Sequence, residues 1–186
     1  MLPLGKEEPP LKKILVLAAL LAVLALTLAL SRAVWQDRGS APGAAPAPAS
    51  ASALRFKTVD RAGNTADESL LAGHSLVILN FWEPWCPPCV GEMPELEKLF
   101  EAYKDRGLLI LGIYSEKGME DKVDEVLADA GTSYPILRSC KDFDAFATGY
   151  VPTTVFVDGE GNILSELLVG SRDYAGWEEL VLSVLK

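Results

Sequence analysis

The amino-acid sequence predicts an α/β fold in which helices flank a mixed central sheet, preceded by one N-terminal transmembrane helix. Apolar runs typical of buried strands alternate with stretches whose apolar residues recur at helical spacing. Two further strands near the C-terminus are separated by a turn sequence, which indicates an antiparallel pair beside the parallel ones. An uncharged run close to the N-terminus is long enough to cross a membrane.

The composition is that of a folded protein and excludes several classes of function. The 186 residues are 49% hydrophobic and 23% charged, so a packed core is expected and global disorder is not. The net charge of −9 excludes a basic nucleic-acid binder, and three cysteines are too few for a disulfide-stapled scaffold. The single histidine, His74, follows Gly73 in a turn sequence and is expected in a surface loop.

Residues 14–35 are predicted to form a membrane anchor, with residues 1–13 on the cytoplasmic side. Residues 14–30 carry no charge and correspond to roughly 25 Å of helix. Lys12 and Lys13 precede this run, and basic residues are enriched on the cytoplasmic side of a membrane. The alternative is a cleaved signal peptide, whose apolar region is about 7–15 residues long and ends in small residues. Either segment exports the rest of the chain.

Residues 36–53 are predicted to be a linker and residues 54–186 the folded domain. The linker consists almost only of Ala, Pro, Ser and Gly and shows no apolar periodicity. It is therefore expected to be an extended, mobile spacer that holds the domain away from the membrane.

The first half of the domain is predicted to contain two buried strands, each followed by a helix. Residues 76–82 and 108–114 are continuous apolar runs, as expected of strands covered on both faces. After each run, apolar residues recur at helical spacing: Met93, Leu96, Leu99, Phe100 and Tyr103, then Met119, Val123, Val126, Leu127 and Ala130.

The second half is predicted to contain a short strand, a helical turn, a hairpin and a final helix. The short strand lies at 136–137, and the helical turn includes Phe143 and Phe146. The turn at 158–162 joins predicted strands at 153–157 and 163–169. The inward residues of the final helix are Tyr174, Trp177, Leu180, Val181, Val184 and Leu185.

Redox chemistry is predicted where a strand gives way to a helix, at Trp85-Cys86-Pro87-Pro88-Cys89. A helix N-terminus offers unpaired N–H groups and the positive end of the helix dipole, which stabilise a thiolate and make Cys86 the nucleophile. Two intervening residues let Cys89 reach back and close a disulfide with Cys86. The two prolines suit the first helical positions, because those positions need no N–H partner.

Two structural alternatives remain for this motif: half of a zinc site, or a disulfide without a redox role. Tetrahedral zinc needs two more ligands, and only Cys140 and His74 are available, without matching spacing. Cys140 is either a buried, inert thiol or a thiol reactive toward a partner. We expect no metal and no cofactor.

The motif and its flanks resemble the active-site segment of membrane-anchored thioredoxin-fold thiol–disulfide oxidoreductases of the TlpA/ResA type. A second segment resembles the cis-proline loop that faces the cysteines in this family. The resemblance covers essentially all of residues 54–186, and an N-terminal membrane anchor is also common in the family. The matching residues are Asn80-Phe81-Trp82-Glu83-Pro84-Trp85-Cys86-Pro87-Pro88-Cys89 with Glu92-Met93-Pro94, and Val151-Pro152-Thr153-Thr154.

The resemblance implies a thioredoxin-like fold and thiol–disulfide exchange on the extracytoplasmic side of a bacterial cytoplasmic membrane. Cys86 attacks a substrate disulfide, and Cys89 resolves the mixed disulfide through a redox-active Cys86–Cys89 pair. Trp85, Tyr150, Val151 and Pro152 contact the substrate chain. The resemblance favours the reducing direction, as in cytochrome c maturation or repair of exported thiols.

The partners implied are disulfide-containing exported proteins and a membrane thiol-transfer electron donor of the CcdA/DsbD kind. The protein is expected to be a monomer that binds the membrane through its N-terminal helix and binds no nucleic acid. The alternatives are an oxidant that donates disulfides, a thioredoxin-fold peroxidase and a metal or haem chaperone. The peroxidase family uses a Thr-x-x-Cys nucleophile, and copper chaperones carry Cys-x-x-x-Cys with a downstream histidine; this sequence has neither.

Three features depart from the pattern of this family or of thioredoxin itself. Glu83-Pro84 replaces the usual Ala-Thr, which places an acid and a rigid kink three residues before Cys86. Tyr150 stands where glycine is common, so the substrate groove is expected to be narrower or more aromatic. Asn80 occupies the place of a buried aspartate in thioredoxin and cannot titrate. The candidate proton acceptors for Cys89 are therefore Glu83 and Glu92, with the alternative that each is an ordinary solvated acid.

Overall fold

The computed structural model describes residues 44–45 and 53–185, which belong to one compact unit, Gly43–Lys186. The predicted cytoplasmic segment, the predicted anchor and most of the predicted linker lie outside the described residues. Among the residues that are described, no helix has both the length and the apolar character needed to span a bilayer.

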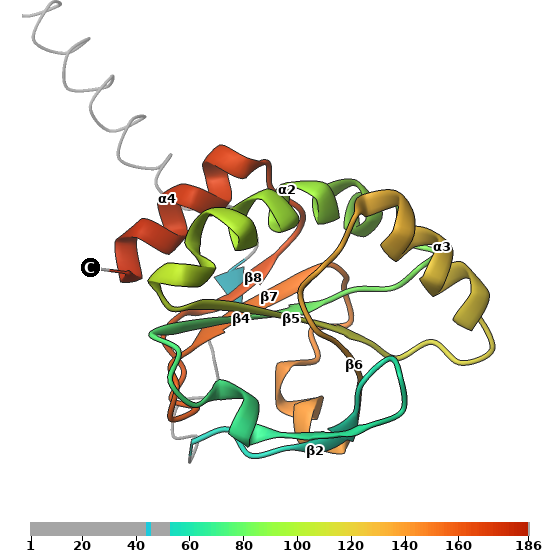
Figure 1. Ribbon diagram of the computed structural model, residues 1–186, viewed down its shortest axis with the longest axis horizontal. Helices are drawn as coiled ribbons and strands as arrows, with labels where there is room; N and C mark the ends of the chain where they lie inside the picture. Colours follow the sequence, from blue (N-terminus) through green and yellow to red (C-terminus); the bar gives the residue numbers. More distant parts are fainter. Residues whose placement is uncertain (1–43, 46–52, 186) are drawn as a thin grey trace, which may run out of the picture. The chain divides into compact units, whose positions relative to one another are not determined.

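A six-stranded mixed sheet forms the centre of the unit (Figure 1), in the order β1-β8-β7-β4-β5-β6. β4 pairs parallel with β5, and β5 parallel with β6, whereas β7, β8 and β1 add antiparallel strands on the other side of β4. The predicted mixed α/β sheet is thus confirmed. The strands are β1 Ala44–Ala45, β4 Leu76–Phe81, β5 Leu108–Tyr114, β6 Ile136–Arg138, β7 Thr153–Val157 and β8 Leu167–Val169.

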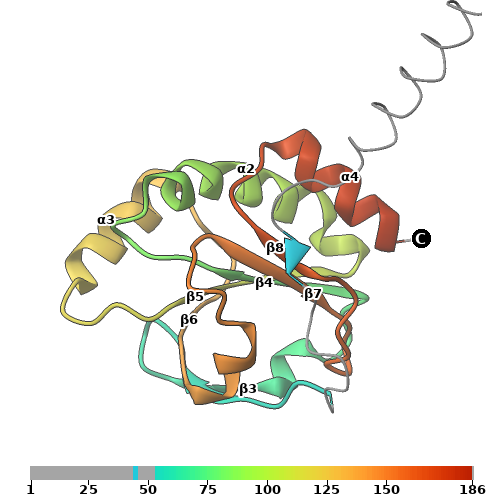
Figure 2. The same ribbon diagram turned by 180° about the vertical axis from the view of Figure 1, so that it is seen from behind.

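Three helices cover one face of this sheet: α2 Pro87–Tyr103, α3 Glu120–Ala130 and α4 Tyr174–Val184 (Figures 1 and 2). The opposite face is covered by smaller elements, namely the paired strands β2 Lys57–Val59 and β3 Thr65–Asp67 and the 3₁₀-helices η2 Glu68–Leu71 and η4 Lys141–Phe146. A further 3₁₀ turn, η3 Lys104–Arg106, follows α2.

β4 shows why the central strands are apolar throughout. Successive side chains of a strand point to opposite faces, so a strand covered on both sides needs apolar residues at every position. Leu76 and Ile78 belong to the core beneath the helices, whereas Val77 and Leu79 belong to the core on the other face. Each of the four is fully buried.

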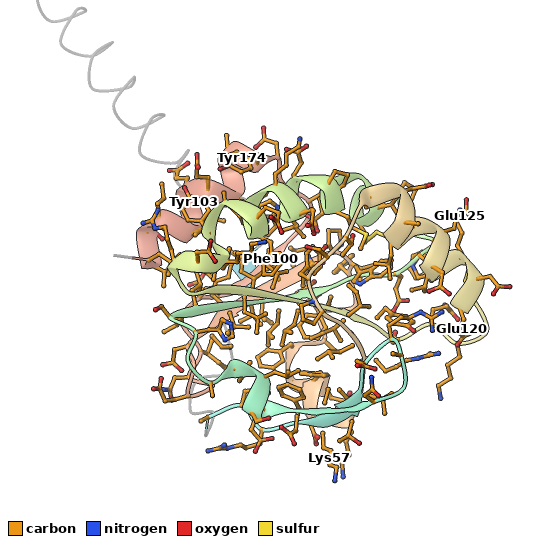
Figure 3. The ribbon with its side chains drawn as sticks, in the orientation of Figure 1. Lys57, Phe100, Tyr103, Glu120, Glu125 and Tyr174 are labelled. Atoms are coloured by element: carbon orange, nitrogen blue, oxygen red, sulfur yellow. A yellow bond between two sulfur atoms is a disulfide. The ribbon has the colours of Figure 1, made fainter. Side chains whose placement is uncertain are left out.

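α2 and α4 are fastened to each other by a shared carboxylate (Figure 3). The hydroxyl groups of Tyr103 at the end of α2 and Tyr174 at the start of α4 both donate to Oε1 of Glu178, each over 2.7 Å. The helix that begins at the cysteines is therefore held at its far end by the C-terminal helix.

The structure corrects three details of the sequence prediction. The strand predicted at 163–169 is shorter, because the Ser165 hydroxyl accepts the N–H of Phe156 and interrupts the ladder; only a bridge at Ile163 precedes β8. The β2–β3 pair was not predicted. Within the predicted linker, Ala44 and Ala45 form β1, whose backbone pairing with β8 was not predicted.

The sheet register brings two distant segments together at one edge. Phe81, the last residue of β4, is paired with Thr153, the first residue of β7. The chain leaving β4 toward α2 therefore lies beside the chain entering β7. These two segments contain the cysteines and Pro152, respectively.

Candidate functional site

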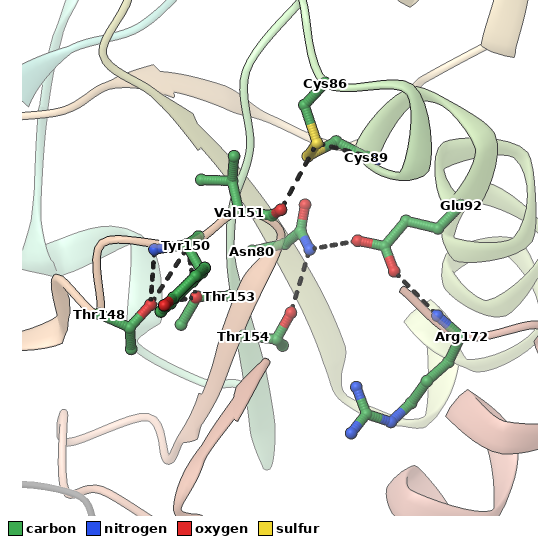
Figure 4. The surroundings of a disulfide bond; sticks show 10 residues. All are labelled: Asn80, Cys86, Cys89, Glu92, Thr148, Tyr150, Val151, Thr153, Thr154 and Arg172. Atoms are coloured by element: carbon green, nitrogen blue, oxygen red, sulfur yellow. Dashed lines mark hydrogen bonds between the residues drawn. A yellow bond between two sulfur atoms is a disulfide. The ribbon is translucent and has the colours of Figure 1, made fainter. Parts of the chain in front are cut away.

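Cys86 and Cys89 form a disulfide at the N-terminus of α2 (Figure 4). Cys86 is the N-cap residue, and its Sγ accepts the N–H of Cys89 over 3.3 Å. Pro87 and Pro88 occupy the first helical positions, where no N–H partner is required. The N–H of Cys89 and the helix dipole thus both point at Cys86, an arrangement that stabilises negative charge on its sulfur after reduction.

The loop before β7 faces the disulfide through Val151 and Pro152. The peptide bond between these two residues is cis, and the carbonyl oxygen of Val151 lies 3.6 Å from Sγ of Cys86. The Pro152 carbonyl accepts the N–H of Gly170. The loop is closed internally by the Thr153 hydroxyl, which donates to the Tyr150 carbonyl over 2.7 Å.

Two aromatic side chains of the segments that carry the cysteines and Pro152 are exposed. The exposed fraction is 54% for Trp85 and 71% for Tyr150, which are large values for such residues. Both line a cavity of about 270 Å³, together with Val151 and the rings of Phe81, Phe143 and Phe146. The predicted substrate-contacting residues Trp85, Tyr150 and Val151 thus share one hollow with several aromatic rings in its lining, whereas Pro152 does not line it.

Glu92 is buried one helical turn after Cys89, with only 2% of its surface exposed. The alternative that it is an ordinary solvated acid is therefore wrong. Its Oε1 accepts from Nδ2 of Asn80 over 3.0 Å, and its Oε2 accepts from the backbone N–H of Arg172 over 3.2 Å. Loss of hydration raises the pKa of Glu92 to about 7, although both hydrogen bonds act in the opposite direction.

Glu83 is buried as well, at 6% exposure, so the solvated alternative is wrong here too. Its oxygens accept hydrogen bonds from the N–H and hydroxyl of Ser115 and from the N–H of Glu116. Glu116 in turn accepts from Nε1 of Trp85 over 3.0 Å. Glu83 and Trp85 together fasten the loop before α2 to the loop after β5.

Asn80 is the polar centre of the site (Figure 4). It is 1% exposed, and its Nδ2 donates both to Glu92 and to the Thr154 hydroxyl, each over 3.0 Å. The sequence predicts no role for Asn80 beyond its inability to titrate. The sequence also does not predict that Thr154, Ser115 and Arg172 bind the polar residues of the site, because these hydrogen bonds join segments that are distant in the chain.

Cys140 and His74 form their side-chain hydrogen bonds with other residues. The thiol of Cys140, which is partly buried, lies 3.7 Å from Oδ2 of Asp142, and Nδ1 of His74 lies 3.3 Å from the Leu71 carbonyl oxygen. Within residues 44–45 and 53–185, no three His, Cys, Asp or Glu side chains are grouped closely enough to hold a metal ion.

Comparison with known proteins finds a family model, relatives named for thiol–disulfide exchange and solved structures of the same fold. The AhpC/TSA family matches residues 49–165 of the chain. A thiol–disulfide oxidoreductase ResA from Halalkalibacterium halodurans is 33% identical over 118 residues, which cover 62% of this chain and 66% of that protein. The ResA of Geobacillus kaustophilus is 31% identical over 130 residues, covering 62% and 73% of the two chains.

A solved structure extends the comparison over most of the chain. A thiol:disulfide interchange protein of the thioredoxin family from Chlorobium tepidum matches with a TM-score of 0.62 and 25% identity. The match covers 79% of this chain and 99% of that one. The thioredoxin-like fold is therefore shown, while the chain spans just under two thirds of the length of the H. halodurans relative.

Proposed function

This chain belongs to the AhpC/TSA family and, within it, to the thiol–disulfide oxidoreductases of the ResA type, and we propose that it reduces disulfide bonds of exported proteins. The observation that carries the proposal is the Cys86–Cys89 disulfide at the start of α2, facing the cis-proline loop. A structural disulfide needs neither the helix N-terminus nor an apolar hollow beside it.

The reaction begins with the reduced pair. The Cys86 thiolate attacks one sulfur of a substrate disulfide, which forms a bond between Cys86 and the substrate and releases the other substrate sulfur as a thiolate. That thiolate takes a proton from solvent. The N–H of Cys89 and the dipole of α2 stabilise the attacking thiolate.

Cys89 then resolves the mixed disulfide. Its sulfur attacks Sγ of Cys86, re-forming the Cys86–Cys89 bond and expelling the second substrate sulfur, so that the substrate gains two electrons and two protons overall. Glu92 accepts the proton that Cys89 loses. Its pKa of about 7 suits a group that must take up and release a proton near neutral pH.

The substrate chain binds along the loop before β7. The backbone of an extended segment pairs with Val151 beside cis-Pro152, and its side chains enter the hollow between Trp85 and Tyr150. Cys86 is 3% exposed and Cys89 is 0% exposed, so an incoming disulfide reaches Cys86 first.

We place this domain outside the cytoplasmic membrane, held there by an anchor within residues 14–35. The anchor's uncharged run supports this location. A reductant in that compartment needs electrons from the cytoplasm, so the proposed donor is a membrane thiol-transfer protein. Cytochrome c maturation and repair of exported thiols are the processes proposed to use it.

The test is the reduction potential of the pair, measured on the purified protein in dithiol buffers. A value near ~−270 mV, as in thioredoxin, fits a reductant, whereas one near ~−120 mV identifies a disulfide donor and overturns the direction. Reduction of insulin gives the activity, which Cys86→Ser is expected to abolish. Full activity of Cys86→Ser would contradict the proposed mechanism.

A further inference from the structure

The oxygen of the Asn80 side chain has no hydrogen-bond partner, although the residue is 1% exposed. Buried polar atoms are rarely left unpaired, because an unmade hydrogen bond costs roughly 1–3 kcal/mol. The amide nitrogen donates to Thr154 and to Glu92, whose ionised carboxylate can only accept, so the unpaired atom is the oxygen. Asn80 therefore has an unused acceptor in the oxidised protein.

The unused oxygen points at the disulfide. Figure 4 shows it directed toward the sulfur atoms of Cys86 and Cys89, on the side of the amide opposite Glu92. A disulfide sulfur has no hydrogen to donate, so no bond can form in this state. Reduction changes this, because each sulfur then either carries a hydrogen or becomes a thiolate.

We propose that Asn80 is the acceptor for the thiol hydrogen of Cys89 in the reduced protein, and that this bond shifts the redox equilibrium toward the dithiol. Reduction by a dithiol breaks the Cys86–Cys89 bond, forms the reagent's own disulfide and transfers two electrons and two protons to the cysteines. One of these protons is on Cys89, where it satisfies the Asn80 oxygen. The inference rests on the proposed function, because it requires that the pair be reduced and reoxidised.

Cys89 rather than Cys86 is the donor because Cys86 has other partners. The Cys86 sulfur already accepts the N–H of Cys89 and lies beside the Val151 carbonyl, and the helix N-terminus favours its thiolate. The Cys89 sulfur is fully buried and has no hydrogen bond of its own among the described residues. Asn80 is thus a positioning residue that holds Cys89 at one end of its amide and Glu92 at the other.

The main test compares the equilibrium with dithiothreitol in the wild-type protein and in Asn80→Ala. The cavity left by the substitution is present in both redox states, so it does not move their balance. Loss of the acceptor is expected to shift the equilibrium about tenfold toward the disulfide, which corresponds to a potential about 30 mV more negative. An unchanged equilibrium in a reversibly cycling protein overturns the inference alone. A wild-type pair that cannot be cycled overturns the proposed function and the inference together.

A matched background separates the two ends of the Asn80 amide. Asn80→Ala also removes the donor to Glu92, so the same comparison is made in Glu92→Gln, which has no carboxylate to be affected. The tenfold shift is expected in both backgrounds. If it disappears in Glu92→Gln, Asn80 acts through Glu92 and the assignment of its oxygen to Cys89 is overturned.

A second measurement leaves Asn80 in place and remains decisive if Asn80→Ala does not fold. In Cys86→Ala/Cys140→Ala, Cys89 is the only thiol of the chain. Its infrared S–H stretching band is expected at the lower frequency of a hydrogen-bonded thiol. A band at the frequency of a thiol in an inert alkane shows that no acceptor is engaged and overturns the inference.

Discussion

Glu83 and Glu92 are both buried carboxyl groups near the disulfide, but their oxygens have different partners. Glu83 accepts three hydrogen bonds, all from the single loop segment Ser115-Glu116. Glu92 accepts two, from Asn80 on β4 and from Arg172 before α4. The first carboxylate connects two loops, whereas the second connects the cysteine helix to β4 and to the segment before α4.

This difference teaches that burial alone does not assign a catalytic role. The hydrogen-bonding capacity of Glu83 is used by the scaffold, and its position in the loop orients Trp85 through Glu116. Burial of Glu92 removes water from its carboxylate, which raises its pKa into the range that suits a proton acceptor near neutral pH. We therefore assign the proton acceptor to Glu92 and a positioning role to Glu83.

The largest expected effect follows from removing the acid at Glu92. Glu92→Gln is expected to slow resolution of the mixed disulfide by about 100-fold at pH 7, because Cys89 loses its proton acceptor. Stopped-flow mixing of reduced protein with a disulfide peptide measures this step. Glu83→Gln is the matched control, and an equal loss there would remove the distinction between the two acids.

The second effect is on stability. The pKa of Glu92 is raised in the folded state. Between about pH 4.5 and 7, Glu92 is therefore protonated in the folded protein but ionised in the unfolded chain. Stability supplied by this group is therefore present at low pH and lost as the pH rises. Between pH 5 and 8 the oxidised protein is expected to lose about 3 kcal/mol at most from this source.

Urea denaturation of the oxidised protein at the two pH values measures this loss. Glu92→Gln is expected to remove most of it, and Glu83→Gln is expected to keep it. A wild-type protein whose stability is the same at pH 5 and pH 8 would contradict the raised pKa of Glu92.

A third effect sharpens the role of Glu83. In Glu83→Gln, an amide NH₂ group faces the N–H of Ser115 or Glu116, so one buried donor loses its acceptor. The free energy of unfolding is expected to fall by about 2 kcal/mol. Thermal or urea unfolding checks this, and a variant as stable as the wild type would show that the link between the loops is dispensable.

The smallest effect concerns the partner of Glu83. Ser115→Ala removes one of the three donors to the carboxylate but leaves the two backbone donors in place. A destabilisation of about 1 kcal/mol is expected by urea denaturation. A loss larger than that of Glu83→Gln would mean that Ser115 has a partner other than Glu83.

Two similar turns show what the sequence could and could not predict about the fold. Asp60–Asn64 and Asp158–Asn162 share the pattern Asp-x-x-Gly-Asn, and in both the first Asp accepts from the N–H and side-chain amide of the Asn. The second was predicted because an apolar strand precedes it. The first was missed because its strands, β2 and β3, have three residues each and are largely exposed.

The site was predictable to the extent that it is local in sequence. The positions of Cys86 and Cys89 at a helix start follow from a strand, a short motif and a helical pattern. The burial of Glu92 does not, because it depends on the packing of α4 and on the N–H of Arg172, 80 residues away. The unpaired oxygen of Asn80 could not be predicted either, because it depends on the pairing of β4 with β7.

The contacts from Gly170 and Arg172 make the site dependent on the order of protein synthesis. Their N–H groups bind Pro152 and Glu92, and both donors are made after the cysteines, the acid and the proline. A growing chain that has not yet reached Arg172 carries Cys86, Cys89 and Cys140 without this arrangement around them. Until then Pro152 and Glu92 lack the N–H donors that bind them in the complete domain.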